Sequence, residues 1–134
     1  MRKGLLTSAG LVTSGALGVA IIVTDRNLWK FEPTHGYALG GFLAVDLGLL
    51  TFILLRGSRL SFRLASSWGI FQALVMLADI FTVPSSLGLT QTQFAEYLFG
   101  LGYYDSAHIA FLFPALFIVN VLVAEFAYFD LRRI

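Results

Sequence analysis

The chain has only two histidines, His35 and His108, and each opens a long apolar stretch. If both stretches run inward through a membrane, both imidazoles lie at the same depth near its outer surface. Two imidazoles at one depth are a possible ligand pair for a single b-type haem, or for a metal ion with Asp79 as a third ligand. The plainer alternative is that both histidines are interfacial residues at helix starts, where Thr34 and Ser106 act as N-caps.

Asp46 is the ionisable residue deepest in an apolar stretch, about eleven residues from either end. Ionisable groups at membrane depth are costly and are the usual place to look for function. Counting from helix ends places four other polar residues at the same depth, and with Asp46 they form a predicted intramembrane polar layer. These four residues are Thr13, Ser14, Gln72 and Asn120. The layer is either a proton or ion path, or a hydrogen-bonded layer that fixes helix register, and in both cases we expect Asp46 to be buried and uncharged or fully hydrogen-bonded.

Glu125 is expected about one turn from the inner surface, level with a group of arginines. Candidate partners for an inner ion pair are Arg56, Arg59 and Arg63. The sharper alternative for Glu125 is a cytoplasmic proton entry point. The sequence contains no HExxH motif, no glycine-rich phosphate loop and no cysteine. Disulfides, thiolate metal sites and cysteine nucleophiles are therefore excluded, and we expect no catalytic site.

The composition is that of a membrane protein. Hydrophobic residues make up 57% of the 134 residues and charged residues 13%, against about 25% charged in a soluble domain. The mean hydropathy is +0.81. A net charge of +1 with scattered basic residues argues against nucleic-acid binding.

Four stretches reach the roughly 20 apolar residues that a membrane-spanning helix needs. We predict an all-α integral membrane protein in which a single domain, residues 1–134, forms a bundle of four transmembrane helices. The predicted spans are 4–24, 35–55, 64–83 and 107–129.

Basic residues set the predicted orientation. Seven of the nine Lys and Arg residues fall on one side of these spans, and Arg26 and Lys30 fall on the other. Because basic loops stay in the cytoplasm, we expect both termini to be cytoplasmic and the protein to lie in the cell membrane. Trp68 is assigned to the aromatic belt on the cytoplasmic side.

The loop before the fourth span contains a predicted interfacial helix over residues 91–99. Thr90 and Gln93 fit a capping box, in which each side chain bonds the other residue's backbone. Apolar residues recur at helical spacing after it.

Small residues predict which helices approach most closely. The first span carries Gly10, Gly15 and Gly18, and the second carries Gly40, Gly41 and Gly48. Because small residues allow close contact between transmembrane helices, we expect these two helices to form the tightest pair.

The leading hypothesis for function is a small accessory subunit of a larger integral-membrane complex, such as a respiratory or other redox complex. The four-helix layout is similar to that of small membrane subunits of respiratory assemblies and of DoxX-like proteins. The expected partners are the lipid bilayer and larger membrane subunits, and no cofactor is expected. The first alternative is a redox subunit that holds one haem b or metal ion, or lines a quinone pocket, through His35 and His108. The second is a small proton-coupled transporter or channel that uses Asp46, Asp79 and Glu125.

Overall fold

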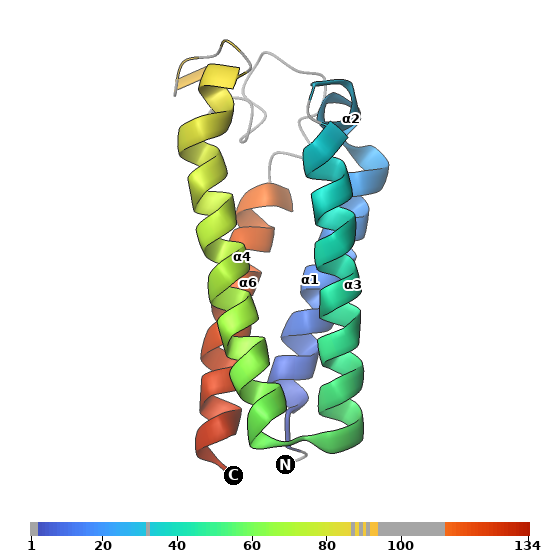
Figure 1. The fold of residues 1–134 in the computed structure, drawn as a ribbon, viewed down its shortest axis with the longest axis vertical. Coiled ribbons are helices and arrows are strands. Elements are labelled where there is room, and N and C mark those ends of the chain that lie inside the picture. The colour runs from blue at the N-terminus through green and yellow to red at the C-terminus, as the bar shows by residue number, and fades with distance from the viewer. Residues whose placement is uncertain (1–2, 32, 87, 89, 91, 94–111) are drawn as a thin grey trace.

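The computed structural model describes residues 3–31, 33–86, 88, 90, 92–93 and 112–134, and the elements within these ranges are helical (Figure 1). The helices are α1 (Leu5–Thr24), α2 (Arg26–Phe31), α3 (Pro33–Arg56), α4 (Arg59–Ser86) and α6 (Leu112–Arg132). Four of them, α1, α3, α4 and α6, are long and apolar enough to cross a membrane. The chain therefore has the character of a multi-pass membrane protein.

The α3–α4 connection is shorter than the sequence predicted, and α4 begins at Arg59 instead of residue 64. Gly57 adopts a left-handed backbone with φ of 52°, which glycine tolerates without strain. Ser58 then caps α4, because its hydroxyl accepts a hydrogen bond from the Ser61 backbone N–H at 3.2 Å. Arg59 and Arg63 consequently lie on the helix and not in a loop.

The short helix α2 was not predicted. It begins after Asp25, whose carboxylate accepts a hydrogen bond from the Leu28 N–H at 3.0 Å, as an N-cap does. The following helix, α3, begins at Pro33, and proline suits the first helical position because its missing N–H has no helical partner there.

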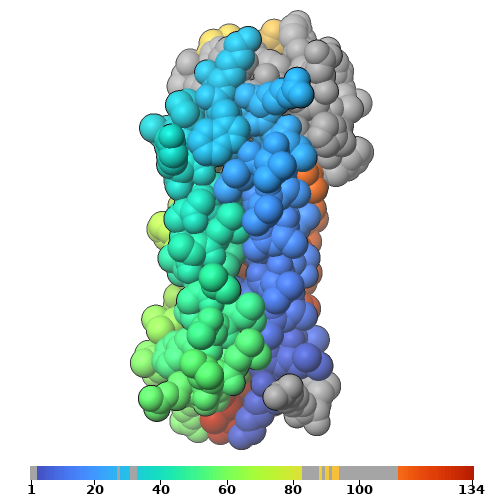
Figure 2. Space-filling view, turned by 90° about the vertical axis from the view of Figure 1, so that its right-hand side faces the viewer, coloured from blue at the N-terminus to red at the C-terminus, as the bar shows by residue number. Residues whose placement is uncertain are grey.

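The four long helices lie side by side, and the two chain ends lie at the same end of the molecule (Figure 1). We call this the terminal end and the other the α2 end. The most extensive contacts are those of α6 with α4 and with α1, followed by α1 with α3, and the contacts of α3 with α4 are less extensive than these three. Figure 2 shows α1 and α3 side by side along one face.

The closest backbone approach is between α4 and α6, not between the first two spans. A Cβ atom on Gly69 would lie 2.6 Å from the Asn120 carbonyl oxygen and 2.8 Å from the Ala124 nitrogen. By contrast, Gly40, Gly41, Gly48 and Gly15 have nothing within 4 Å of that position. The predicted pairing was wrong because most of the α3 glycines it relied on do not face a neighbouring helix.

Two apolar clusters fill the interior. The larger lies toward the terminal end and contains Leu11, Leu49, Ile53, Phe62, Ala65, Val123 and Ala127. The smaller lies toward the α2 end and contains Ile21, Met76 and Leu116. Between the two clusters, the polar side chains of the candidate site occupy the middle of the helices.

The predicted capping box is present. The Thr90 N–H donates to Gln93 Oε1 at 2.9 Å, and the Gln93 N–H donates to Thr90 Oγ1 at 3.2 Å. The rest of the predicted interfacial helix, residue 91 and residues 94–99, lies outside the described residues.

Candidate functional site

The Asp46 carboxyl group is the centre of a polar cluster halfway along the helices. Asp46 is 3% exposed. Its Oδ1 accepts hydrogen bonds from Trp68 Nε1 at 2.7 Å and from Gln72 Nε2 at 3.0 Å, both on α4. Its Oδ2 accepts one from the Ser14 hydroxyl of α1 at 3.0 Å. Both carboxyl oxygens therefore have partners, from two neighbouring helices.

Ser14 connects this cluster to the fourth long helix. Its Oγ lies 3.5 Å from Oδ1 of Asn120, which is fully buried on α6. A serine hydroxyl has one proton, so it donates either to Asp46 or to Asn120 at any moment. The Asn120 amide nitrogen donates to the Leu116 carbonyl of its own helix at 2.9 Å.

The structure brings together four of the five residues predicted for the polar layer. Ser14, Asp46, Gln72 and Asn120 meet, one from each long helix. Thr13 does not join them. It is exposed, and its hydroxyl bonds the Ala9 carbonyl of the same helix at 2.8 Å. Neighbouring residues of a helix point about 100° apart, so Thr13 and Ser14 share a depth but not a face.

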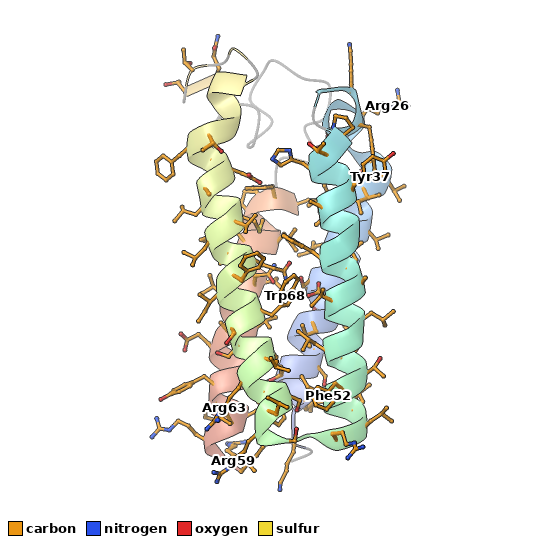
Figure 3. The ribbon with its side chains drawn as sticks, in the orientation of Figure 1. Arg26, Tyr37, Phe52, Arg59, Arg63 and Trp68 are labelled. Atoms are coloured by element: carbon orange, nitrogen blue, oxygen red, sulfur yellow. The ribbon has the colours of Figure 1, made fainter. Side chains whose placement is uncertain are left out.

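Trp68 is the member of the layer that sequence reasoning missed. It was assigned to an aromatic belt, yet its indole N–H makes the shortest of the three bonds to Asp46, and Figure 3 shows it between α4 and α3. The available signal was its spacing, because Trp68 lies four residues before Gln72 and therefore on the same face of the helix.

Aromatic rings occupy the seam between α3 and α4 beside the polar layer. Trp68 stacks on Phe71 with ring centroids 5.5 Å apart, and Phe42 of α3 packs edge-to-face with Trp68 with ring centroids 5.2 Å apart. These contacts hold the indole in place while its N–H points at Asp46.

His35 and Asp79 meet across the same seam, nearer the α2 end. Their atoms Nε2 and Oδ1 are 3.3 Å apart, so two of the three residues suggested as metal ligands are in contact. His108 lies outside the described residues, and its pairing with His35 stays a prediction. Within the described ranges, no group of three or more His, Cys, Asp or Glu residues is placed to hold a metal ion.

Glu125 is exposed on α6. Of the other described residues, none forms a hydrogen bond or an ion pair with it. Its predicted partners Arg56, Arg59 and Arg63 are also exposed, and Arg59 instead donates to the Ile134 carbonyl at 3.3 Å.

Asp130 is a buried carboxylate that the sequence analysis did not single out. It is 5% exposed, and its Oδ2 accepts a hydrogen bond from the Thr7 hydroxyl at 2.6 Å. The Thr7 N–H points to the same oxygen at 3.4 Å. This pair joins α1 to α6 near the terminal end.

Comparison with known proteins adds no relative: no protein-family model, no curated protein and no solved structure matches the chain. The residues alone therefore carry the interpretation. They give a hydrogen-bonded polar layer at mid-helix, a histidine–aspartate contact toward the α2 end and a buried threonine–aspartate bond toward the terminal end.

Proposed function

We propose that the chain is a small structural subunit of a larger integral-membrane complex, with a respiratory or other redox complex as the first candidate. The observation that carries the proposal is that both oxygens of Asp46 are engaged and together accept three hydrogen bonds. Hydrogen bonds between transmembrane helices hold them in register. A carboxyl group used in this way supports a scaffold role in preference to a site that binds and releases a substrate.

The proposal includes a membrane orientation. Among the described residues, six Lys and Arg belong to the terminal end, including Arg56, Arg59 and Arg132, and two, Arg26 and Lys30, belong to the α2 end. By the positive-inside rule this end faces the cytoplasm, and the protein lies in the cell membrane as a four-helix bundle. Its partners are lipids and larger membrane subunits, not nucleic acid.

The test is purification of the tagged chain from its native membranes in a mild detergent, followed by a native mass measurement. We expect a mass that includes at least one other membrane protein in fixed stoichiometry. A particle that contains this chain alone, as one copy or several, would overturn the proposed function. A matched preparation that carries the tag on an unrelated four-helix membrane protein controls for contaminants.

Proton transfer along the α3–α4 seam is the second candidate, and the His35–Asp79 contact of 3.3 Å favours it. An imidazole and a carboxyl group in contact can pass a proton between them, and Asp46 lies on the same seam, three turns along α3 from His35. Liposomes that contain the purified chain would then show proton flux, and Asp79→Asn and Asp46→Asn would abolish it. Equal flux in wild type, both variants and empty liposomes would remove this candidate.

A further inference from the structure

Glu125 is an acidic residue on α6, a helix that is long and apolar enough to span a membrane. It is five residues beyond Asn120, which is about 7.5 Å along the helix, and seven residues before the end of α6. Its exposed neighbours on the same face are apolar or aromatic, among them Val121 and Tyr128. A charged group at such a position is normally paired within protein.

Contacts on each side of Glu125 show that it points away from the rest of the molecule. Val123 lies against Gly10 of α1, and Ala124 lies against Gly69 of α4. Each step along a helix turns about 100°, so the next residue, Glu125, points outward from the α4–α6 pair.

Arg63 points outward from the same pair. On α4, Trp68 contacts Asp46 of α3 and Gly69 contacts α6, so the next residue, Ile70, points outward. Arg63 lies two turns before Ile70 and shares its face. Figure 3 shows Arg63 beside the lower part of α6, near the terminal end.

Together these residues define a surface that we call the α4–α6 outer face. All of its members are exposed, and it carries one basic and one acidic residue among mostly apolar side chains. Its members are Arg63, Ser67, Ile70 and Leu74 on α4, and Ile118, Val121, Glu125 and Tyr128 on α6.

The relative heights of the two charges follow from a contact between the helices. The Ser66 hydroxyl donates to the Ala124 carbonyl at 3.1 Å, so Ser66 and Glu125 lie at nearly the same height. Arg63 is three residues, or about 4.5 Å, closer to the terminal end. An extended arginine side chain spans this offset.

We propose that the α4–α6 outer face binds a second copy of this chain through two reciprocal Arg63–Glu125 ion pairs. In a two-fold pair with both copies in the same membrane orientation, α4 of one copy faces α6 of the other, and each contact occurs twice. Arg63 then faces Glu125 of the second copy, and Ile70 faces Val121. Arg63 and Glu125 do not pair within one copy, but each lies opposite the complementary charge of the second copy.

Exchange of the charges tests this pairing. Glu125→Arg and Arg63→Glu each place like charges opposite one another in a pair of identical variants. We expect the self-association constant of each variant to fall at least about tenfold. Co-expressed with different tags, the two variants have opposite charges at both contacts, and we expect the mixed pair to be recovered at the wild-type level.

Self-association of either variant at the wild-type level would overturn the proposal. Failure of the mixture to restore pairing would also overturn it, because an ion pair within one chain predicts that result. If the charge variants do not fold, disulfide cross-linking provides a second measurement. It uses chains that keep both wild-type charges, and the wild-type chain contains no cysteine. One copy carries Ile70→Cys and a differently tagged copy carries Val121→Cys, and we expect a disulfide between them.

The matched control replaces Ile70→Cys with Leu47→Cys, which is 64% exposed on α3. Cross-linking equal to this control would overturn the pairing. The inference goes beyond the proposed function, and the two hypotheses can fail separately. A purified particle of two copies and no other protein would support the two-copy contact and overturn the subunit role. A larger complex that contains a single copy would support the subunit role and overturn the two-copy contact.

Discussion

Asp46 illustrates how one carboxyl group is accommodated in the middle of an apolar helix. Its three hydrogen bonds come from three chemically different donors, an indole, a primary amide and a hydroxyl. All are shorter than or equal to 3.0 Å. The arrangement tolerates replacement by any side chain that keeps an acceptor at Oδ1 and a polar atom at Oδ2.

Asp46→Asn and Asp46→Leu should therefore differ. Asparagine keeps the acceptor for Trp68 and Gln72, and Ser14 then accepts from the new amide and donates to Asn120. Leucine leaves all three donors without this partner. With about 0.6 kcal/mol for an average interhelical hydrogen bond, we expect Asp46→Leu to lower the free energy of unfolding by about 2 kcal/mol, measured by SDS titration in detergent.

The asparagine variant should stay within about 0.5 kcal/mol of wild type, since no hydrogen bond is lost. Leu47→Ala, at an exposed position beside Asp46, is the matched control. Equal losses for the asparagine and leucine variants would show that the hydrogen bonds do not stabilise the helices.

The sequence predicted how far along each helix the polar residues lie, but not which side of the helix each of them faces. Counting from helix ends placed Ser14, Gln72 and Asn120 near Asp46, and they do meet. The same counting could not separate Thr13 from Ser14, because their difference is a rotation set by packing. Asp130 was overlooked because a carboxylate near a helix end normally reaches water, and only the contact with Thr7 shows it to be buried.

At the scale of the helices, hydropathy predicted the four long elements, whereas local capping decided where one of them, α4, and the short helix α2 begin. Ser58 and Asp25 accept backbone hydrogen bonds that start α4 and α2. Such short-range signals are weak beside a 20-residue apolar pattern, so α2 was taken for a loop. The close approach of α4 to α6 was not predicted because it occurs at Gly69, a single glycine outside the two glycine-rich spans.

Gly69→Ala should destabilise the protein, because the added methyl group meets backbone atoms of α6 at 2.6 and 2.8 Å. Backbone cannot move aside as a flexible side chain can. Overpacking of this kind costs about 1–3 kcal/mol. The same SDS titration measures it, and Gly48→Ala, with nothing within 4 Å, should be nearly neutral. A smaller loss for Gly69→Ala than for Gly48→Ala would contradict the close approach.

Thr7→Val tests the bond that joins α1 to α6. Valine keeps the shape of threonine but removes the hydroxyl donor, so the buried Asp130 carboxylate loses its closest side-chain contact. A hydrogen bond to such a group contributes about 1.5–3 kcal/mol. Thr51→Val is the control, because Thr51 is exposed and bonds only its own helix at the Leu47 carbonyl. Similar unfolding free energies for the two variants would argue against the α1–α6 bond.

For the whole molecule, the structure places both chain ends together (Figure 1), and the proposed orientation puts them in the cytoplasm. Because the chain has no cysteine, single cysteines report accessibility without background. We expect Lys3→Cys and Ile134→Cys to react with a membrane-impermeant maleimide only in opened cells, and Thr90→Cys to react in intact cells. The opposite pattern would reverse the orientation, and different reactions at Lys3 and Ile134 would contradict an even number of crossings.

The position of the Asp46 donors along the chain has a consequence for biosynthesis. Ser14, Trp68 and Gln72 all precede α6 in the sequence. Chains emerge from the ribosome N-terminus first, so the carboxyl group acquires its full set of partners as soon as α4 is made. The last helix then adds Asn120, Val123 and Asp130 to surfaces that already exist. Insertion of Asp46 into the membrane and completion of the core by α6 are therefore separate events in time.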